Sequence, residues 1–408
     1  MHARPTIALP LPRTFLTLAA AAALGCAGPP APASPAPAPT LADALGPRVQ
    51  QVVDSIQAGA GFPGVTVGVA FRDGSSLGVA AGWADTTRRE RMTPDHLLLQ
   101  GSVGKTYVSA VALQLVSEGR LSLDAPVASY LGGLPWYGRL PNAQGMTVRM
   151  LMNHTSGLQR YEFSDAFTRD LTAQPQRVWR PEELLAYLDG AAAPFAPGAG
   201  WDYSDTNYIV LGIIIERLTG HRYYDEARRR LLEPLGLAST TPSDRAVIPG
   251  LAQGYAGPGN PFGGADAMLD AQGRMSINPQ FEWTGGGMAS TSRDLARWAH
   301  ALYGGRLLRP EVMREMLAGV PAPLGPAGTT YGLGVIVRPT ALGTSYGHSG
   351  FFPGYVAEVM YFPDRGLAVA VQVNTSHGPA LDPPPARVLG AVVRALDAAQ
   401  AAAATPPP

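Results

Sequence analysis

The chain has 408 residues, an ordinary apolar content of 46% and equal numbers of acidic and basic residues, so its formal net charge at pH 7 is zero. This length allows two or three folding units and a large core, and the lack of a basic surplus excludes nucleic acid or an anionic membrane surface as the partner of a charged face. The single cysteine, Cys26, excludes an intramolecular disulfide and a cysteine-based metal site.

The basic residues are divided unevenly, because arginine supplies all of them except Lys105. Arginine stays protonated in proteins, whereas a buried lysine can lose its proton and act as a base. The lone lysine therefore marks a position where that chemistry would be possible. An arginine-biased codon usage with one stray lysine explains the same count, and composition alone leaves both interpretations open.

Residues 1–26 are predicted to be an export signal of the lipoprotein type. Arg4 and Arg13 precede an apolar stretch of ten residues (15–24, FLTLAAAAAL), which is too short to span a bilayer. The stretch 23–26 (ALGC) resembles a lipobox, so Cys26 would become a lipidated N-terminus at the cell envelope or periplasm. A plain secretory signal is the alternative. Residues 27–40 form a Pro/Ala-rich tether, and residues 399–408 are predicted to be a disordered tail.

Periodicity predicts β elements at both ends of one domain, residues 41–398, and helices between them. Helices are expected at 41–58, from Ser102 to Gly119, and at 181–188, 207–218, 223–232, 292–303, 310–317 and 386–398. Strands are expected at 64–71, 77–82, 331–337, 344–348, 355–362 and 367–373. The predicted fold class is α+β: one antiparallel sheet built from about 60–85 and 330–375, flanked by the terminal helices, with a mostly helical region inserted at about 100–320.

Ser102 and Lys105 lie three residues apart at the start of a predicted helix. That spacing places both side chains on one face, within reach of each other, and the helix N-terminus offers free N–H groups to a developing oxyanion. A serine hydroxyl becomes a nucleophile when a base takes its proton. Lysine could be that base if its pKa fell from about 10.4 toward neutrality. A helix-start serine and a solvated lysine are the structural alternative.

A second segment, 203–208 (YSDTNY), opens the predicted helix at 207–218. Tyr203, held near a lysine, could transfer a proton to a leaving group. A packing tyrosine and a helix cap at Asp205 explain the segment equally well.

A third segment, 347–351 (GHSGF), ends a predicted strand near the C-terminus. His348 and Ser349 could bind a substrate carboxylate, and the backbone N–H after Gly350 could face an oxyanion. A strand end followed by a glycine turn is the alternative interpretation.

The order of these segments, Ser-x-x-Lys, then Tyr-Ser-x, then His-Ser-Gly, resembles the serine β-lactamase and penicillin-binding protein superfamily, in particular the class C β-lactamase and D,D-carboxypeptidase branch. The stretches 153–158 (NHTSGL), 285–288 (GGGM) and 353–355 (PGY) are similar to that branch too. The resemblance covers about residues 45–398 and implies a fold of the β-lactamase/D,D-peptidase type.

The resemblance also implies roles for the residues. Ser102 would be the acylated nucleophile, Lys105 its base or proton relay, and Tyr203 a second general acid/base facing the leaving group. The backbone N–H groups of Ser102 and Phe351 would form the oxyanion hole. Substrate-binding positions would be Asp205, His348, Ser349 and Gly350, whereas His154 and Ser156 would be structural. No cofactor and no metal ion are implied, because the seven histidines do not cluster.

Four positions depart from the pattern of the branch. Gly104 replaces a usual Ser or Ala, and Gln100 replaces an aliphatic residue. Asp205 stands where β-lactamases have Asn; an ionised Asp cannot donate a hydrogen bond to the substrate carbonyl, and it would keep Lys105 protonated and shift the base role toward Tyr203. His348 stands where β-lactamases have Lys, and a neutral imidazole would hold a carboxylate less firmly.

The sequence therefore predicts an exported serine hydrolase that acts through an acyl-enzyme on D-amino-acid peptides or related amides and esters. Two alternatives stay open: a carboxylesterase on the same scaffold, and a non-catalytic lipoprotein that binds peptidoglycan. The expected partner is a small peptide, amide or ester substrate, with peptidoglycan as a further candidate and no nucleic acid. The membrane would be reached only through a lipid anchor.

Overall fold

The computed structural model describes residues 38–258, 260, 262 and 265–404. The chain divides into two units, Met1–Ala38 and Pro39–Pro408, and every helix and strand of the described residues belongs to the second unit. The predicted signal peptide with Cys26, the tether as far as residue 37 and residues 405–408 lie outside the described residues. No helix in the described part of the chain is both long and apolar enough to cross a bilayer.

The main sheet has nine strands in the order β3-β2-β1-β12-β11-β10-β9-β8-β7, and its neighbouring strands are antiparallel. A small second sheet has the order β4-β6-β5. The strands are β1 Gly64–Ala70, β2 Ser76–Asp85, β3 Glu90–Arg91, β4 Leu98–Leu99, β5 Thr240–Pro242, β6 Met288–Ser290, β7 Val320–Pro321, β8 Thr330–Tyr331, β9 Ile336–Thr340, β10 Gly343–Phe352, β11 Tyr355–Phe362 and β12 Leu367–Val373.

The two ends of the chain meet at the centre of the main sheet, because β1 pairs with β12 through contacts such as Val67 with Val371. Both strands are buried along their whole length, which explains why their sequences are nearly continuous apolar runs. The predicted α+β fold with a sheet built from both chain ends is confirmed.

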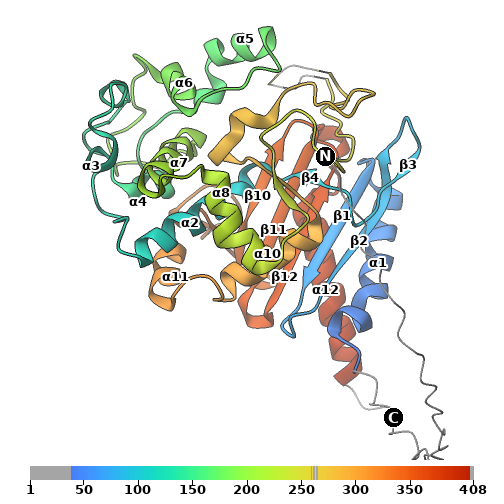
Figure 1. Cartoon of the computed structure of the whole chain (residues 1–408). Helices are drawn as coiled ribbons and strands as arrows, with labels where there is room; N and C mark the ends of the chain where they lie inside the picture. The colour runs from blue at the N-terminus through green and yellow to red at the C-terminus, as the bar shows by residue number, and fades with distance from the viewer. Residues whose placement is uncertain (1–37, 259, 261, 263–264, 405–408) are drawn as a thin grey trace, which may run out of the picture. The chain divides into compact units, whose positions relative to one another are not determined.

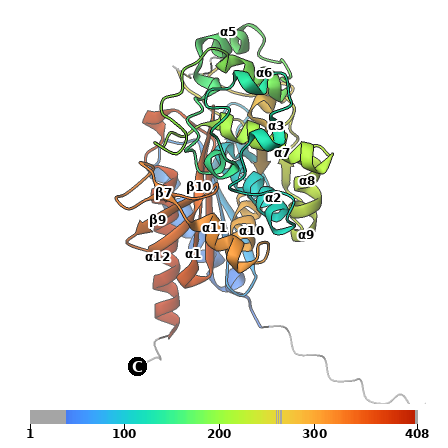
Figure 2. The ribbon, with the colours of Figure 1, turned by 90° about the vertical axis from the view of Figure 1, so that its left-hand side faces the viewer.

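The helices are α1 Leu41–Gly59, α2 Lys105–Ser117, α3 Ala128–Leu131, α4 Val148–Met152, α5 Asp165–Ala173, α6 Pro181–Leu185, α7 Asp205–Thr219, α8 Tyr223–Ala227, α9 Glu233–Leu235, α10 Ser292–Tyr303, α11 Pro310–Leu317 and α12 Pro385–Ala404. Helices α1 and α12 pack against each other and cover one face of the sheet. Helix α10 packs on the opposite face, on the side of the inserted helices (Figures 1 and 2).

Three elements differ from the sequence prediction. The expected helix 223–232 is a short α8 followed by a π-helical turn at Arg228–Leu232. The expected strand 331–337 is divided into β8 and β9, since Gly334 between them has a φ of 78°. The tail expected to be disordered from residue 399 is helical as far as Ala404, because alanine has the highest helix propensity and α12 continues through it.

Gly68 in β1 lets α10 lie directly on the sheet. A Cβ built at this position would come within 1.8 Å of the carbonyl oxygen of Ser292, the first residue of α10. Backbone cannot yield as a flexible side chain can, so the close contact requires glycine.

We expect Gly68→Ala to lower the free energy of unfolding by about 3 kcal/mol, because overpacking a rigid contact typically costs about 1–3 kcal/mol. Urea denaturation measures the change. The control is Gly133→Ala, where a Cβ meets no atom within 4 Å and the change should stay below about 0.5 kcal/mol. Equal stabilities of Gly68→Ala and the parent would contradict this account of the packing.

Candidate active site

Ser102 and Lys105 come together at the start of α2. A 3₁₀ turn, Gly101–Gly104, leads into the helix, whose first residue is Lys105. Lys105 Nζ lies 3.1 Å from Ser102 Oγ. The lysine side chain is fully buried, whereas Ser102 is half-buried and lines two neighbouring pockets. The Ser-x-x-Lys spacing read from the sequence therefore corresponds to a direct contact between the two side chains.

Glycines hold this turn against the end of β10. Gly101 has a φ of 51°, and a Cβ there would come within 2.6 Å of the backbone nitrogen of Phe351. A Cβ at Gly350 would come within 1.8 Å of the carbonyl oxygen of Gln100. These contacts place the backbone of Ser102 beside that of Phe351, as the expected oxyanion hole requires.

The departure at Gly104 has a packing reason. A Cβ at this position would come within 1.6 Å of the carbonyl oxygen of Gly286, in the segment that precedes β6. The turn is thus pressed between β10 and residues 285–287, and the usual Ser or Ala would not fit.

Lys105 carries its proton in this site. Its Nζ donates hydrogen bonds to Asp205 Oδ1 and to the carbonyl oxygen of Gly285. Burial alone would lower the pKa of Lys105, but the neighbouring Asp205 and Tyr203 together raise the pKa above its ordinary value. The condition for lysine as the base, a pKa near neutrality, is therefore not met, because an ionised partner outweighs desolvation, as the sequence indicated from Asp205.

Asp205 is ionised for the reciprocal reason. Burial would raise its pKa, but Lys105 and Arg160 lower the pKa below the ordinary value. Arg160 Nη2 lies 3.5 Å from Asp205 Oδ2. Asp205 is the first residue of α7, so the helix N-terminus adds a favourable dipole. Both of its carboxylate oxygens face cations. Asp205 therefore forms ion pairs with Lys105 and Arg160, and its side chain lies on the inner side of the site.

Tyr203 lies over the lysine. Lys105 Nζ is 4.8 Å from the centroid of the Tyr203 ring, and the His154 ring supports the tyrosine at 4.3 Å between centroids. Burial raises the pKa of Tyr203 above 10.0, although Lys105 opposes the shift. The Tyr203 hydroxyl is buried and has no hydrogen bond of ordinary geometry among the described residues. It lies within reach of Lys105 and Ser102, whose contacts with the hydroxyl oppose the rise of its pKa.

His348 is held as a neutral imidazole. Its Nε2 lies 2.9 Å from the hydroxyl of Tyr331, and its Nδ1 lies 2.5 Å from the carbonyl oxygen of Ser349, which assigns the proton to Nδ1. Burial, with Lys105 nearby, lowers the pKa of His348 to about 3. His348 lines the site, but it offers no positive charge to a substrate carboxylate.

Sequence reasoning missed two buried carboxyl groups, Glu162 and Glu282. Burial and the charge of Asp205 raise the pKa of Glu162 to about 8, and the same two causes raise that of Glu282. Arg160 Nε donates to Glu162 Oε1 at 2.6 Å, but the other oxygen, Oε2, is buried without a hydrogen-bond partner among the described residues, as is Oε2 of Glu282. Neither residue belongs to a recognisable spacing, so nothing in the sequence marked them.

Ser102 opens onto two cavities. The inner pocket, of about 240 Å³, is lined by Ser102, Arg160, Tyr161, Glu162, Phe163, Asp205, Phe262, Phe281, Glu282, Phe351, Phe352 and Pro353. The outer cleft, of about 490 Å³, is lined by Ser102, Arg160, Phe163, Tyr203, Leu324, Ile336, His348, Ser349, Gly350, Phe351 and Val356. Of the predicted site residues, Asp205 thus faces the inner pocket, whereas Tyr203, His348, Ser349 and Gly350 face the outer cleft.

The described residues contain no group of three or more His, Cys, Asp or Glu side chains arranged to hold a metal ion. The chemical groups that the structure gathers at Ser102 are the Lys105 ammonium, the Tyr203 phenol and the backbone of Phe351.

Comparison with known proteins places the chain in a family. The Beta-lactamase family model matches residues 49–393. Penicillin-binding protein 4* of Bacillus subtilis is 26% identical over 297 residues, which cover 70% of this chain and 62% of that protein. Esterase EstB of Burkholderia gladioli is 30% identical over 334 residues, or 73% of this chain and 82% of the esterase.

Among solved structures, a D-amino acid amidase from Ochrobactrum anthropi SV3, complexed with L-phenylalanine amide, has a TM-score of 0.72 and 26% identity over 88% of this chain and 99% of the amidase. The chain belongs to the β-lactamase family and is a serine hydrolase of that fold. It spans less than two thirds of the length of the B. subtilis penicillin-binding protein.

We expect Lys105 and Asp205 to be coupled strongly in a double-mutant cycle for unfolding. Asp205→Asn leaves a buried, uncompensated ammonium and should cost about 3 kcal/mol, whereas Lys105→Met together with Asp205→Asn should cost less than the sum of the single changes. The contribution of Lys105 is present below its ordinary pKa of 10.5, and that of Asp205 is present above its ordinary 3.8. The coupling should therefore be constant between about pH 5 and 9.

The matched control is the exposed pair Arg309–Glu311, where the same cycle with glutamine substitutions should give less than about 1 kcal/mol. Urea denaturation at several pH values measures both cycles. Additive effects at 105 and 205 would contradict the ionised pair.

Proposed function

We propose that the protein hydrolyses amide bonds, and related esters, whose acyl part is an amino acid with a free ammonium group and an apolar side chain. The observation that carries this proposal is the distribution of charge around Ser102. Carboxyl groups with unsatisfied oxygens lie on one side of the nucleophile, and a neutral His348 lies on the other.

The position of Tyr203 indicates which cavity holds the leaving group of the substrate and which holds its acyl part. Its hydroxyl is the group placed to give a proton to the leaving nitrogen, and Tyr203 lines the outer cleft but not the inner pocket. The leaving group therefore occupies the outer cleft, and the acyl part occupies the inner pocket. The backbone N–H groups of Ser102 and Phe351 hold the carbonyl oxygen between them.

The inner pocket suits an aromatic amino-acid side chain and its ammonium group. Phenylalanine side chains dominate its walls. Glu162 is 3% exposed, its Oε2 has no hydrogen bond of ordinary geometry in the described part of the chain, and the neighbouring Asp205 helps to keep its carboxyl protonated. An ammonium group would donate a hydrogen bond to Glu162 and would favour its ionised form. The similarity to a D-amino acid amidase supports the same substrate class.

The outer cleft is less suited to a substrate that ends in a carboxylate next to the scissile bond, as in D,D-carboxypeptidase chemistry. Among the described residues Arg160 is the only cation lining the cleft, and it is already paired with Glu162 and Asp205. His348 is neutral at any physiological pH. An amidase or aminopeptidase activity fits these charges better than a carboxypeptidase activity.

The proton path in acylation needs no neutral lysine. As Ser102 Oγ attacks the carbonyl carbon, Tyr203 gives its hydroxyl proton to the leaving nitrogen, the C–N bond breaks, and the proton of Ser102 replaces the lost proton on Tyr203 Oη. Lys105 stays protonated throughout and stabilises the negative charge on the phenolic oxygen while proton donation runs ahead of proton uptake. In deacylation a water molecule attacks the ester, and its proton returns through Tyr203 to Ser102 Oγ.

The test compares phenylalanine amide, in both stereoisomers, with 3-phenylpropanamide, which lacks the ammonium group. We expect Glu162→Gln to raise KM for phenylalanine amide about tenfold, the value of one charge-assisted hydrogen bond, and to leave the ammonium-free amide within twofold. Affinity for phenylalanine amide should be greatest near pH 8, because Glu162 is protonated below its pKa of about 8 and the α-ammonium is deprotonated above about 8.

Two controls make the test decisive. Ser102→Ala should abolish turnover and the covalent adduct that mass spectrometry detects on the parent, and the exposed Glu182→Gln on α6 should behave like the parent. Faster hydrolysis of a peptide ending in D-Ala-D-Ala than of either amide, or equal effects of Glu162→Gln on both amides, would rule out the assigned acyl group.

Esterase activity is the second candidate. The outer cleft, whose one cation among the described residues is already paired, accepts a phenol or alcohol as readily as an amine, and the similarity to esterase EstB supports this candidate. Nitrophenyl esters of short acids would then be turned over through Ser102 with no dependence on Glu162.

The proposal includes a location at the cell envelope, with a lipid anchor on Cys26 and peptidoglycan as a neighbour. Its support is the sequence of residues 1–26, which lie outside the described residues. We expect cells that express the full chain to incorporate labelled palmitate into it, and Cys26→Ser to remove the label and release the protein from the membrane fraction. Unchanged fractionation of Cys26→Ser would point to a plain secretory signal.

A further inference from the structure

The largest cavity among those described lies away from Ser102. It has a volume of about 530 Å³, which is within the range of small-molecule sites. Strands β9, β10 and β11 form one wall, the first half of α12 forms another, and the loop at Leu324 closes one end. We call it the distal cavity.

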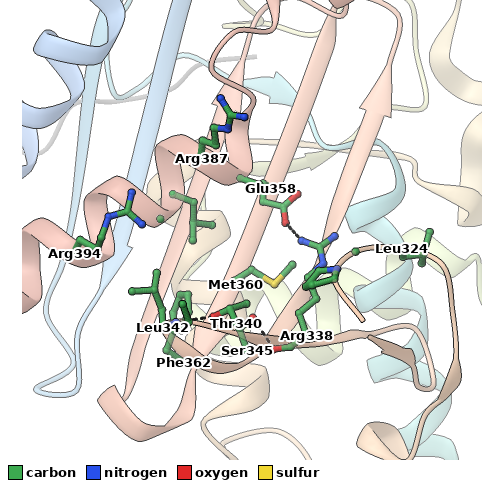
Figure 3. Close-up of a pocket in the computed structure, with 16 residues that line it drawn as sticks. Leu324, Arg338, Thr340, Leu342, Ser345, Glu358, Met360, Phe362, Arg387 and Arg394 are labelled. Carbon is green, nitrogen blue, oxygen red and sulfur yellow. Dashed lines mark hydrogen bonds and ion pairs between the residues drawn. The ribbon is translucent and has the colours of Figure 1, made fainter. Parts of the chain in front are cut away.

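The distal cavity combines an apolar floor with positive charge. Met360 and Phe362 on β11 and Leu389 on α12 are buried and line it. Figure 3 shows Arg387 and Arg394 projecting from α12, and Arg338 reaching Glu358 on the strand side.

The two cations of the helix are available to a ligand. Glu358 is the only carboxylate that the described residues contribute to the cavity, and it already forms an ion pair with Arg338. Arg387 has one weak partner, Asp382 at 3.9 Å, and both side chains are more than three quarters exposed. Arg394 has no ion pair among the described residues. The helix side of the cavity therefore carries a net positive charge.

The strand register shows that this cavity continues the outer cleft. Directly paired residues share one face of a sheet, and Phe351 pairs with Val356, Ser349 with Glu358, and Ser345 with Arg338. The first of these pairs lines the outer cleft, the last lines the distal cavity, and the middle pair contributes one residue to each. Leu324 lines both spaces.

The distance along β10 decides how long a ligand must be to extend from the outer cleft into the distal cavity. Ser349 at the cleft and Ser345 at the distal cavity are four residues apart, or about 13 Å at about 3.3 Å per residue. A small leaving group would stop short of the cavity, whereas an extended chain would enter it.

We infer that the distal cavity is a subsite for the far end of an extended leaving group, with an apolar chain over Met360 and Phe362 and an anionic terminus at Arg387 and Arg394. This inference rests on the proposed function, because it assigns the outer cleft to the leaving group. It adds that the natural substrate is long and amphipathic, with its negative charge distant from the scissile bond.

The first experiment uses amides of phenylalanine with two series of leaving amines, ω-amino acids and n-alkylamines of matched length. For the parent protein we expect kcat/KM to rise with chain length and to favour the carboxylate-ended amine about tenfold at eight carbons, mainly through KM. Arg387→Gln with Arg394→Gln should remove this preference and leave phenylalanine amide itself within twofold. Arg48→Gln, an exposed arginine on α1, is the matched control.

A second variant tests the space without removing a charge, although the new side chain contacts Arg394. At Gly390 on α12 a Cβ would meet Arg394 at 3.3 Å and Leu342 at 3.9 Å, so Gly390→Leu should occupy the cavity. Both long series should then lose their advantage over phenylalanine amide. If this variant does not fold, the two surface arginine substitutions still decide the charge requirement.

Binding of 8-aminooctanoate, the free leaving group, provides a readout that is independent of turnover. Calorimetry should show binding that weakens at least fivefold in the double arginine variant and at higher salt. Rates that are independent of chain length and terminal charge, or equal binding to parent and variant, would overturn the distal subsite. Failure of the parent to hydrolyse even phenylalanine amide, with 8-aminooctanoate still bound through the arginines, would instead overturn the proposed reaction and leave the subsite standing.

Discussion

The buried ion pair between Lys105 and Asp205 is the interaction on which the rest of the site depends. Two unit charges removed from water are tolerated only when each meets the other with good geometry, and here Arg160 and the start of α7 complete the neutralisation. The pair keeps the lysine protonated, and the proposed proton path depends on that state. In the proposed mechanism the tyrosine beside this ammonium, and not the lysine, is the relay.

Backbone contacts are the second constraint, and they explain the glycines that surround Ser102. The turn at 101–104 touches β10 on one side and residues 285–287 on the other at distances that exclude a Cβ. Because these contacts join a helix start, a strand end and a loop that are far apart in the sequence, the nucleophile and the backbone N–H of Phe351 are positioned together. The expected oxyanion hole would thus depend on the whole interface.

The charges around the nucleophile divide the substrate into parts of different chemistry. Carboxyl groups with raised pKa values line the inner pocket, and a neutral histidine lines the outer cleft. Two exposed arginines of α12, of which Arg387 has only a weak ion pair, line the distal cavity. Each group is poorly solvated or incompletely paired in the protein alone. A substrate with an ammonium group at one end and an anion at the other would satisfy both ends.

The sequence by itself determined the fold class and the meeting of both chain ends in one sheet, because these follow from local periodicity. It also indicated the segments that carry Ser102, Lys105, Tyr203 and His348, because their order resembles that of the serine β-lactamase and penicillin-binding protein superfamily. It also indicated, from Asp205 alone, that the lysine would stay protonated. Only the tertiary structure decided the burial of Glu162 and Glu282 in the inner pocket, the place of Arg387 and Arg394 at the distal cavity, the division of the strand after Tyr331 and the continuation of α12 to Ala404. Those features depend on burial, on charges brought together from distant segments and on register between strands, none of which a single sequence encodes in a local pattern.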